Sequence, residues 1–109
     1  MLFIILAMIL VCSMPNPSKS DKSYWQKLTN IVGCCICRFY HNIYYNGVSI
    51  HHIDGRTKPG AHRNVLPLCA GHHQTGGEGV AIHPYKRRWE ENYGTQIKLK
   101  ERCDRMIGE

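Results

Sequence analysis

The chain has 109 residues, of which 43% are hydrophobic, and its 14 Lys and Arg against 8 Asp and Glu give a net charge of +6. This length suits one small domain, and the composition excludes an acidic or strongly disordered chain. A core of this size usually needs reinforcement by disulfides or a metal, and the 6 Cys and 7 His are candidates for either.

The chain starts with an apolar run, MLFIILAMILV. It is shorter than the about 20 residues of a membrane span, so we expect no stable membrane association. It resembles the apolar region of a signal peptide, but no Lys or Arg precedes it. We therefore favour a mis-called start or an incidental extension, with export as the alternative. Residues 1–22 are expected to be leader and linker, and residues 23–109 the folded domain.

The first predicted helix begins at a capping box formed by Ser23 and Gln26 and ends at Gly33. Asn46-Gly47 is a hairpin turn signal, and the residues after it alternate like a strand over 48–53. Residues 65–68 indicate a short return strand, in which a proline marks an edge or the end.

The carboxyl-terminal half predicts a tight turn or short helix over 69–73, then a helix that starts at Pro84 and ends at Gly94. A last amphipathic helix is expected from Thr95 to Gly108. Its apolar stripe consists of Leu99, Cys103, Met106 and Ile107. The fold class is therefore α+β, one domain of short elements around metal.

Paired spacing of Cys and His indicates a structural metal site. Cys34 and Cys37 form a C-x-x-C, and Cys69 and His72 form a C-x-x-H. Zinc ligands are presented in this way, whereas a disulfide scaffold spreads its cysteines through loops. We favour a Cys3His zinc site over disulfides, with Cys35 as a substitute thiolate. Free thiols imply a reducing compartment, and hence the cytoplasm.

Further motifs carry a family resemblance. IHHI, NVLPLC and the following HH resemble the HNH endonuclease motif, which implies a small ββα-metal fold with flanking helices. HHIDGRTKPGAH, PLCAGHHQTGGEGVAIH and WEENYGT resemble the phage Ref family of recombination-enhancement nucleases. That resemblance implies RecA-dependent DNA cleavage, with DNA and a RecA filament on single-stranded DNA as partners.

The HNH resemblance also implies roles for the histidines. His51 matches a metal ligand and His52 the general base, and as strand neighbours they should face opposite sides. Asn64 matches the middle residue of the motif, and His73 the second ligand. His83 is either a third ligand or a helix N-terminal residue with a satisfied hydrogen bond. Mg²⁺ is the expected ion, although imidazoles also accept Mn²⁺ or Zn²⁺.

Charge along the chain suits a polyanionic substrate, because Asp54 is the only acid between Ser23 and Gly77. His62 lies in the basic loop after Asp54 and contacts phosphate, contacts the metal, or is simply a surface residue. The candidate DNA contacts are Arg56, Lys58, Arg63, Lys86, Arg87 and Arg88.

The sequence thus predicts a metal-dependent DNA endonuclease, in which His52 deprotonates water. The alternative is a non-catalytic zinc module that binds DNA or protein. Such a module needs the Cys3His site and the basic loop, but not His51, His52 and His73 together. A Gly-rich nucleotide loop, a G-x-S-x-G elbow and a glycosidase carboxylate pair are not found in the sequence.

Overall fold

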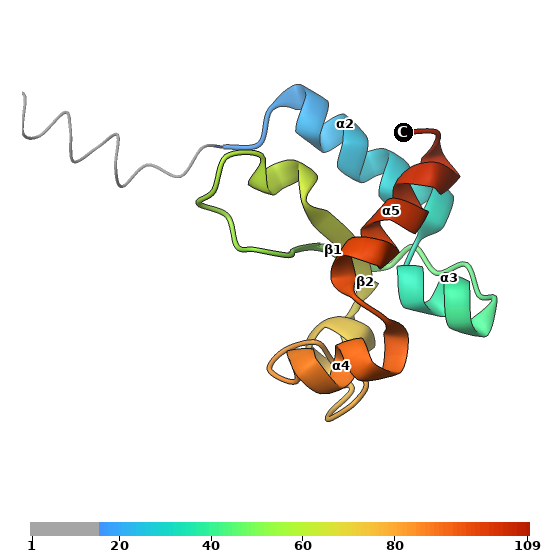
Figure 1. The fold of residues 1–109 in the computed structure, drawn as a ribbon. Helices are drawn as coiled ribbons and strands as arrows, with labels where there is room; N and C mark the ends of the chain where they lie inside the picture. The colour runs from blue at the N-terminus through green and yellow to red at the C-terminus, as the bar shows by residue number, and fades with distance from the viewer. Residues whose placement is uncertain (1–15) are drawn as a thin grey trace, which may run out of the picture.

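The computed structural model describes residues 16–109, which form a small α+β fold (Figure 1). The apolar leader lies outside these residues. In chain order the helices and strands are α2 (Lys19–Lys27), α3 (Cys35–His41), β1 (Val48–His52), β2 (Val65–Cys69), α4 (Lys86–Tyr93) and α5 (Gln96–Ile107). Over the described range, no helix has both the length and the apolar character that crossing a bilayer requires.

Helix α2 begins earlier than predicted, within the segment expected to be a linker. The prediction of a capping box at Ser23 is therefore wrong. Ser18 is the N-cap. Its hydroxyl accepts a hydrogen bond from the Asp21 backbone N–H at 3.0 Å, and the Asp21 carboxylate accepts one from the Ser18 N–H at 2.9 Å. A carboxylate at this position also interacts favourably with the helix dipole, which a glutamine amide does not.

We expect Ser18→Ala to lower the free energy of unfolding by about 1 kcal/mol, because it removes a side-chain cap. Ser23→Ala is the matched control. It replaces an exposed serine inside the helix with the residue of highest helix propensity, so stability should stay equal or rise slightly. Urea unfolding followed by circular dichroism measures both, and equal effects of the two substitutions would contradict the observed cap.

Helix α2 continues into a π-helical turn, Leu28–Val32, and ends at Gly33 as predicted. Gly33 has φ +70°, and a Cβ there would lie 2.5 Å from the Tyr45 carbonyl oxygen. That oxygen accepts a hydrogen bond of 2.8 Å from the Cys34 backbone N–H. Glycine thus lets the chain turn sharply and places Cys34 at the start of α3.

Strands β1 and β2 form an antiparallel pair with Val48 opposite Cys69 and His52 opposite Val65. The prediction of a hairpin turn at Asn46-Gly47 is wrong, because β1 pairs with β2, which follows it across the loop 53–64. The chain before that turn makes no strand, since its Tyr45 carbonyl is bound to the backbone near α3. A proline is tolerated inside β2 because each strand of a two-stranded sheet has a free edge.

The helix predicted from Pro84 begins only at Lys86. Backbone N–H groups of Ile82 and His83 donate to the carbonyls of His72 and His73 at 2.9 and 3.0 Å, so this segment pairs with the turn before it instead of entering a helix. The last helix forms as predicted, with Thr95 as N-cap and Gly108 as C-cap.

The hydrophobic core lies between the hairpin and the helices α2, α3 and α5, which surround it in Figure 1. Leu99 and Cys103 of the α5 stripe are buried in it. Met106 was expected on the same stripe but is 36% exposed. It faces a groove beside α3, which is described below.

Candidate functional site

Four potential metal ligands meet at the junction of β2 and α3. Cys34 is the N-cap of α3 and Cys37 lies in its first turn, whereas Cys69 ends β2 and His72 lies in the π-helical turn Gly71–Thr75. The Sγ atoms of Cys34 and Cys37 lie 3.6 and 3.7 Å from His72 Nδ1. Cys69 Sγ lies 3.2 Å from that nitrogen and 3.9 Å from Cys37 Sγ.

These separations fit a metal ion such as zinc. Metal–sulfur and metal–nitrogen bonds of about 2.3 and 2.1 Å in a tetrahedron place sulfurs about 3.8 Å apart and nitrogen about 3.6 Å from sulfur. Burial and the neighbouring Cys34 thiol raise the pKa of Cys37 to about 12. A cation is therefore needed to hold the thiolate form at neutral pH.

The cysteines of residues 16–109 are all free thiols, so the disulfide alternative is not realised there. Cys35 was considered as a substitute ligand. It is fully buried and is not part of the cluster formed by Cys34, Cys37, Cys69 and His72. Its pKa is raised well above that of an ordinary thiol by burial, which suits a neutral core side chain.

A second cluster consists of His51, His73 and His83, whose ligand atoms lie within 4.8 Å of one another. His51 Nε2 is 2.8 Å from Gln96 Oε1, and His73 Nδ1 is 2.7 Å from Ser49 Oγ. Each bond occupies one ring nitrogen and leaves the other for a ligand, as is usual for metal-binding histidines. His83 is exposed and belongs to this cluster rather than to a helix N-terminus.

Burial lowers the pKa of His51 to about 4, and burial also lowers that of His73. Both imidazoles are therefore neutral at pH 7, and the neutral form is the one that binds a cation. The three rings fit a divalent cation. A neutral imidazole does not repel a cation, and the rings of His51 and His73 are already oriented by hydrogen bonds from their other nitrogen to Gln96 and Ser49.

Gln96 and Ser49 are functional candidates that the sequence did not reveal. Ser49 shares a strand face with His51, so alternation alone could have found it. Gln96 is the first residue of α5 and is 2% exposed. Its backbone N–H donates to Glu90 Oε2 at 3.0 Å. Nothing in the local sequence indicates that this glutamine meets a histidine 45 residues earlier.

His52 has a different environment from that of His51. Its Nε2 lies 3.0 Å from His62 Nδ1, and Trp25 packs edge-on against both rings. The Trp25 indole N–H also donates to the His62 carbonyl at 2.7 Å. His62 is 8% exposed, so the interpretation as a surface histidine is wrong. Burial, Arg56 and His62 lower the pKa of His52.

A cavity of about 210 Å³ at the end of β1 joins these environments. Its lining includes His51, His52, His83, Lys86 and Gln96. Two histidines of the cluster, His51 and His83, thus border the same space as the predicted base, although His51 and His52 make separate hydrogen bonds.

The side-chain amide of Asn64 donates to Asp54 Oδ2 at 3.2 Å, and the Asn64 backbone carbonyl accepts from the Ile53 backbone N–H at 3.0 Å. Asn64 therefore closes the base of the loop between the strands. Its amide contacts no histidine among the interactions resolved over residues 16–109.

The predicted DNA contacts differ in their partners. Arg56 and Lys58 are exposed in the loop between the strands, and neither forms an ion pair within the described part of the chain. Arg87 and Arg88 both pair with Glu91, at 3.5 Å each. Lys86 lines the cavity described above.

Arg63 is bound within the fold. It lies 3.4 Å from Asp21 and 3.3 Å from Glu109, and its guanidinium lies over the Tyr24 ring. These contacts tie the loop between the strands to α2 and to the carboxyl terminus.

A comparison with models of protein families matches most of the chain. The family model described as "Recombination enhancement, RecA-dependent nuclease" matches residues 17–108. The match includes both histidine and cysteine clusters and the whole of the described fold except its end residues.

Proposed function

Because the chain belongs to the family of recombination-enhancement, RecA-dependent nucleases, we propose that it is a metal-dependent DNA endonuclease of the HNH type. The observation that carries the proposal is the second cluster, His51, His73 and His83, of which His51 and His83 line the cavity that His52 also borders. A zinc module that only binds DNA or protein has no need of this second set.

Two ions have different roles in this proposal. Zinc is held by Cys34, Cys37, Cys69 and His72, and all four positions are taken by protein, as in structural sites. The three imidazoles of His51, His73 and His83 hold a divalent cation. Mg²⁺ is the ion expected from the family resemblance, and imidazole ligands also accept Mn²⁺ or Zn²⁺. When bound, that cation supplies Lewis-acid stabilisation of the phosphate and of the leaving 3′ oxygen.

His52 acts as the general base in this scheme. Its Nδ1 is buried, so Nε2 is the atom that can accept a proton from the attacking water, once that water replaces His62 Nδ1 as the hydrogen-bond partner of Nε2. The lowered pKa of His52 keeps the imidazole ring neutral at neutral pH, which is the form that can act as a base. His62 Nδ1, at 3.0 Å from Nε2, orients the ring together with the edge of Trp25. Asn64 supports the site indirectly, by closing the loop.

DNA phosphates are bound by exposed basic side chains of the loop between the strands and of α4. Arg56, Lys58 and Lys86 form no ion pair within residues 16–109 and are the first candidates. Arg87 and Arg88 contribute in part, because Glu91 offsets some of their charge. Arg63 is assigned to the fold instead, since its guanidinium already has partners in α2 and at Glu109.

The direct test is DNA cleavage with and without a RecA filament, which we propose as the partner on single-stranded DNA in the cytoplasm. Supercoiled plasmid is paired with a RecA-coated homologous oligonucleotide, and Mg²⁺ is added. We expect cuts within the paired region, with 3′-hydroxyl and 5′-phosphate ends. Omitting RecA or chelating Mg²⁺ should suppress them. If DNA is bound but never cut under any of these conditions, the zinc-module interpretation replaces this one.

A second prediction concerns Gln96. We expect Gln96→Ala to weaken Mn²⁺ binding at the three-histidine site by about 10- to 100-fold, because His51 loses the group that orients its ring. Electron paramagnetic resonance of free Mn²⁺ measures the affinity. Gln26→Ala, an exposed substitution in α2, is the control and should leave it unchanged. Unaltered Mn²⁺ affinity in a folded Gln96→Ala protein would show that Gln96 does not position His51.

A further inference from the structure

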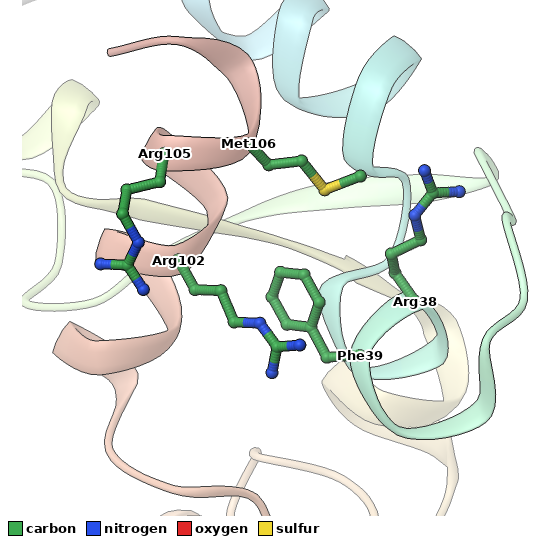
Figure 2. A pocket seen from close by; sticks show the side chains of 5 residues that line it. All are labelled: Arg38, Phe39, Arg102, Arg105 and Met106. Carbon is green, nitrogen blue, oxygen red and sulfur yellow. The ribbon is translucent and has the colours of Figure 1, made fainter.

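A second basic surface lies between α3 and α5, and the proposed active site uses none of its residues. A cavity of about 460 Å³, here named the arginine groove, is lined by Arg38, Phe39, Arg102, Arg105 and Met106. Figure 2 shows Arg102 and Arg105 extending from α5 and Arg38 from α3, with the Phe39 ring and the Met106 thioether between them. The groove therefore has an apolar floor and cationic walls.

Within residues 16–109, none of the three guanidinium groups forms an ion pair with an acidic side chain, because every ion pair there involves another cation. Arg102 lies 4.1 Å from the centroid of the Phe39 ring, and Arg38 lies 5.8 Å from that of Tyr44. Stacking on a ring orients a guanidinium but leaves its N–H groups free to donate. The groove thus presents oriented, unneutralised donors suited to an anion.

Exposed aromatic rings continue the groove beyond Arg38. Tyr44 is 47% exposed, and its hydroxyl donates to the Asn30 carbonyl at 2.8 Å, which holds the ring in place. Tyr45 is 51% exposed on the same segment between α3 and β1. Exposed aromatic rings beside a positive groove are the combination by which proteins bind single strands, because unpaired bases stack on the rings.

We propose that the arginine groove and Tyr44 bind single-stranded nucleic acid, with phosphates on the guanidinium groups and bases on the Phe39 and Tyr44 rings. Duplex bases are stacked on each other and cannot reach the rings, so a single strand fits better. An acidic peptide would satisfy the arginines but would make no use of the aromatic and thioether floor. This proposal rests on the proposed function only in that it takes DNA as the ligand.

Helix α5 connects this groove to the proposed active site. Gln96 at its start contacts His51, and Arg102 and Arg105 follow about 9 and 14 Å further along at 1.5 Å per residue. At 3.6 residues per turn these two arginines are also turned by about 240° and 180° around the helix axis from Gln96. The groove therefore lies on another side of α5 than the three-histidine cluster, and a single strand bound there would leave the active site open to the DNA that is cut.

The test measures binding without cleavage, by fluorescence anisotropy in the His52→Ala protein. The probe is an oligothymidylate of about 20 nucleotides, longer than the roughly 4–16 nucleotides of one single-strand site. Arg102→Ala with Arg105→Ala should lower its affinity at least about tenfold and reduce the salt slope by about 1.4, the value for two lost phosphate contacts. Lys19→Ala with Lys22→Ala removes the same charge from α2 and should change the affinity less than about twofold.

Tyr44 gives an independent measure of stacking. Tyr44→Ala should weaken oligothymidylate binding about tenfold, which corresponds to about 1.4 kcal/mol, and Tyr44→Phe should retain it. A duplex of equal length should be affected much less by any of these changes.

Several results would overturn the proposal. If the arginine and lysine double variants lose equal affinity for oligothymidylate, binding depends only on the total charge of the protein. If the groove substitutions weaken duplex and single-strand binding equally, the groove has no preference for single strands. If the groove binds poly-glutamate and the groove substitutions leave oligothymidylate binding unchanged, the groove is a surface for an acidic protein instead. Failure of the wild-type protein to cut DNA would overturn the proposed function alone and leave this binding result standing.

Discussion

His52→Ala is expected to reduce DNA cleavage by about 10²- to 10⁴-fold, the contribution typical of a positioned general base. DNA binding and zinc content should stay nearly unchanged, because the substitution removes none of the loop cations and no member of the Cys3His cluster. Rates are measured on the RecA-paired plasmid over a range of Mg²⁺ and Mn²⁺ concentrations. His41→Ala, on the exposed end of α3, is the matched histidine control and should cut normally.

Metal dependence separates the base from the ligands. His51→Ala and His73→Ala should also lose activity, but through weaker cation binding, so raised Mn²⁺ should partly restore them. It should not restore His52→Ala, whose three-histidine cluster is intact. If His52→Ala cuts as fast as wild type across these metals, His52 is not the base.

Cys69→Ser is expected to unfold the domain. A structural zinc supplies free energy on the order of 10 kcal/mol to a small module, which is comparable with the about 5–15 kcal/mol of total stability of a domain. Wild-type protein should contain one zinc that survives removal of the more weakly held cation. Elemental analysis and circular dichroism should show that Cys69→Ser lacks both zinc and helical signal.

Cys103→Ala is the control for this experiment. It removes a buried thiol outside the cluster, so the protein should lose some stability but keep its zinc. Cys37→Ser should behave like Cys69→Ser. A protein that stays folded without metal, or disulfides among these cysteines in its mass spectrum, would disprove the structural zinc.

Short-range patterns explain why much of the fold could be predicted. The two strands, the helix stop at Gly33 and the last helix depend on alternation, left-handed glycine and an apolar stripe, all of which are local. The same holds for the pairs Cys34 with Cys37 and Cys69 with His72, since each spacing spans about one helical turn. The errors are local as well: Ser18 caps α2 because a nearby aspartate, rather than the expected glutamine, completes its box.

By itself, the sequence determined the chemistry available to this protein: a family resemblance, two sets of side chains that could hold a metal ion, and histidine neighbours on opposite faces of one strand. Tertiary structure alone decided several other contacts across long separations. Gln96 reaches His51 only because α5 packs against the hairpin, and Arg63 is drawn from the basic loop to Asp21 and Glu109. Likewise the arginine groove exists because α3 and α5 lie side by side. Such contacts depend on packing between distant elements, which leaves no periodic signal in the chain.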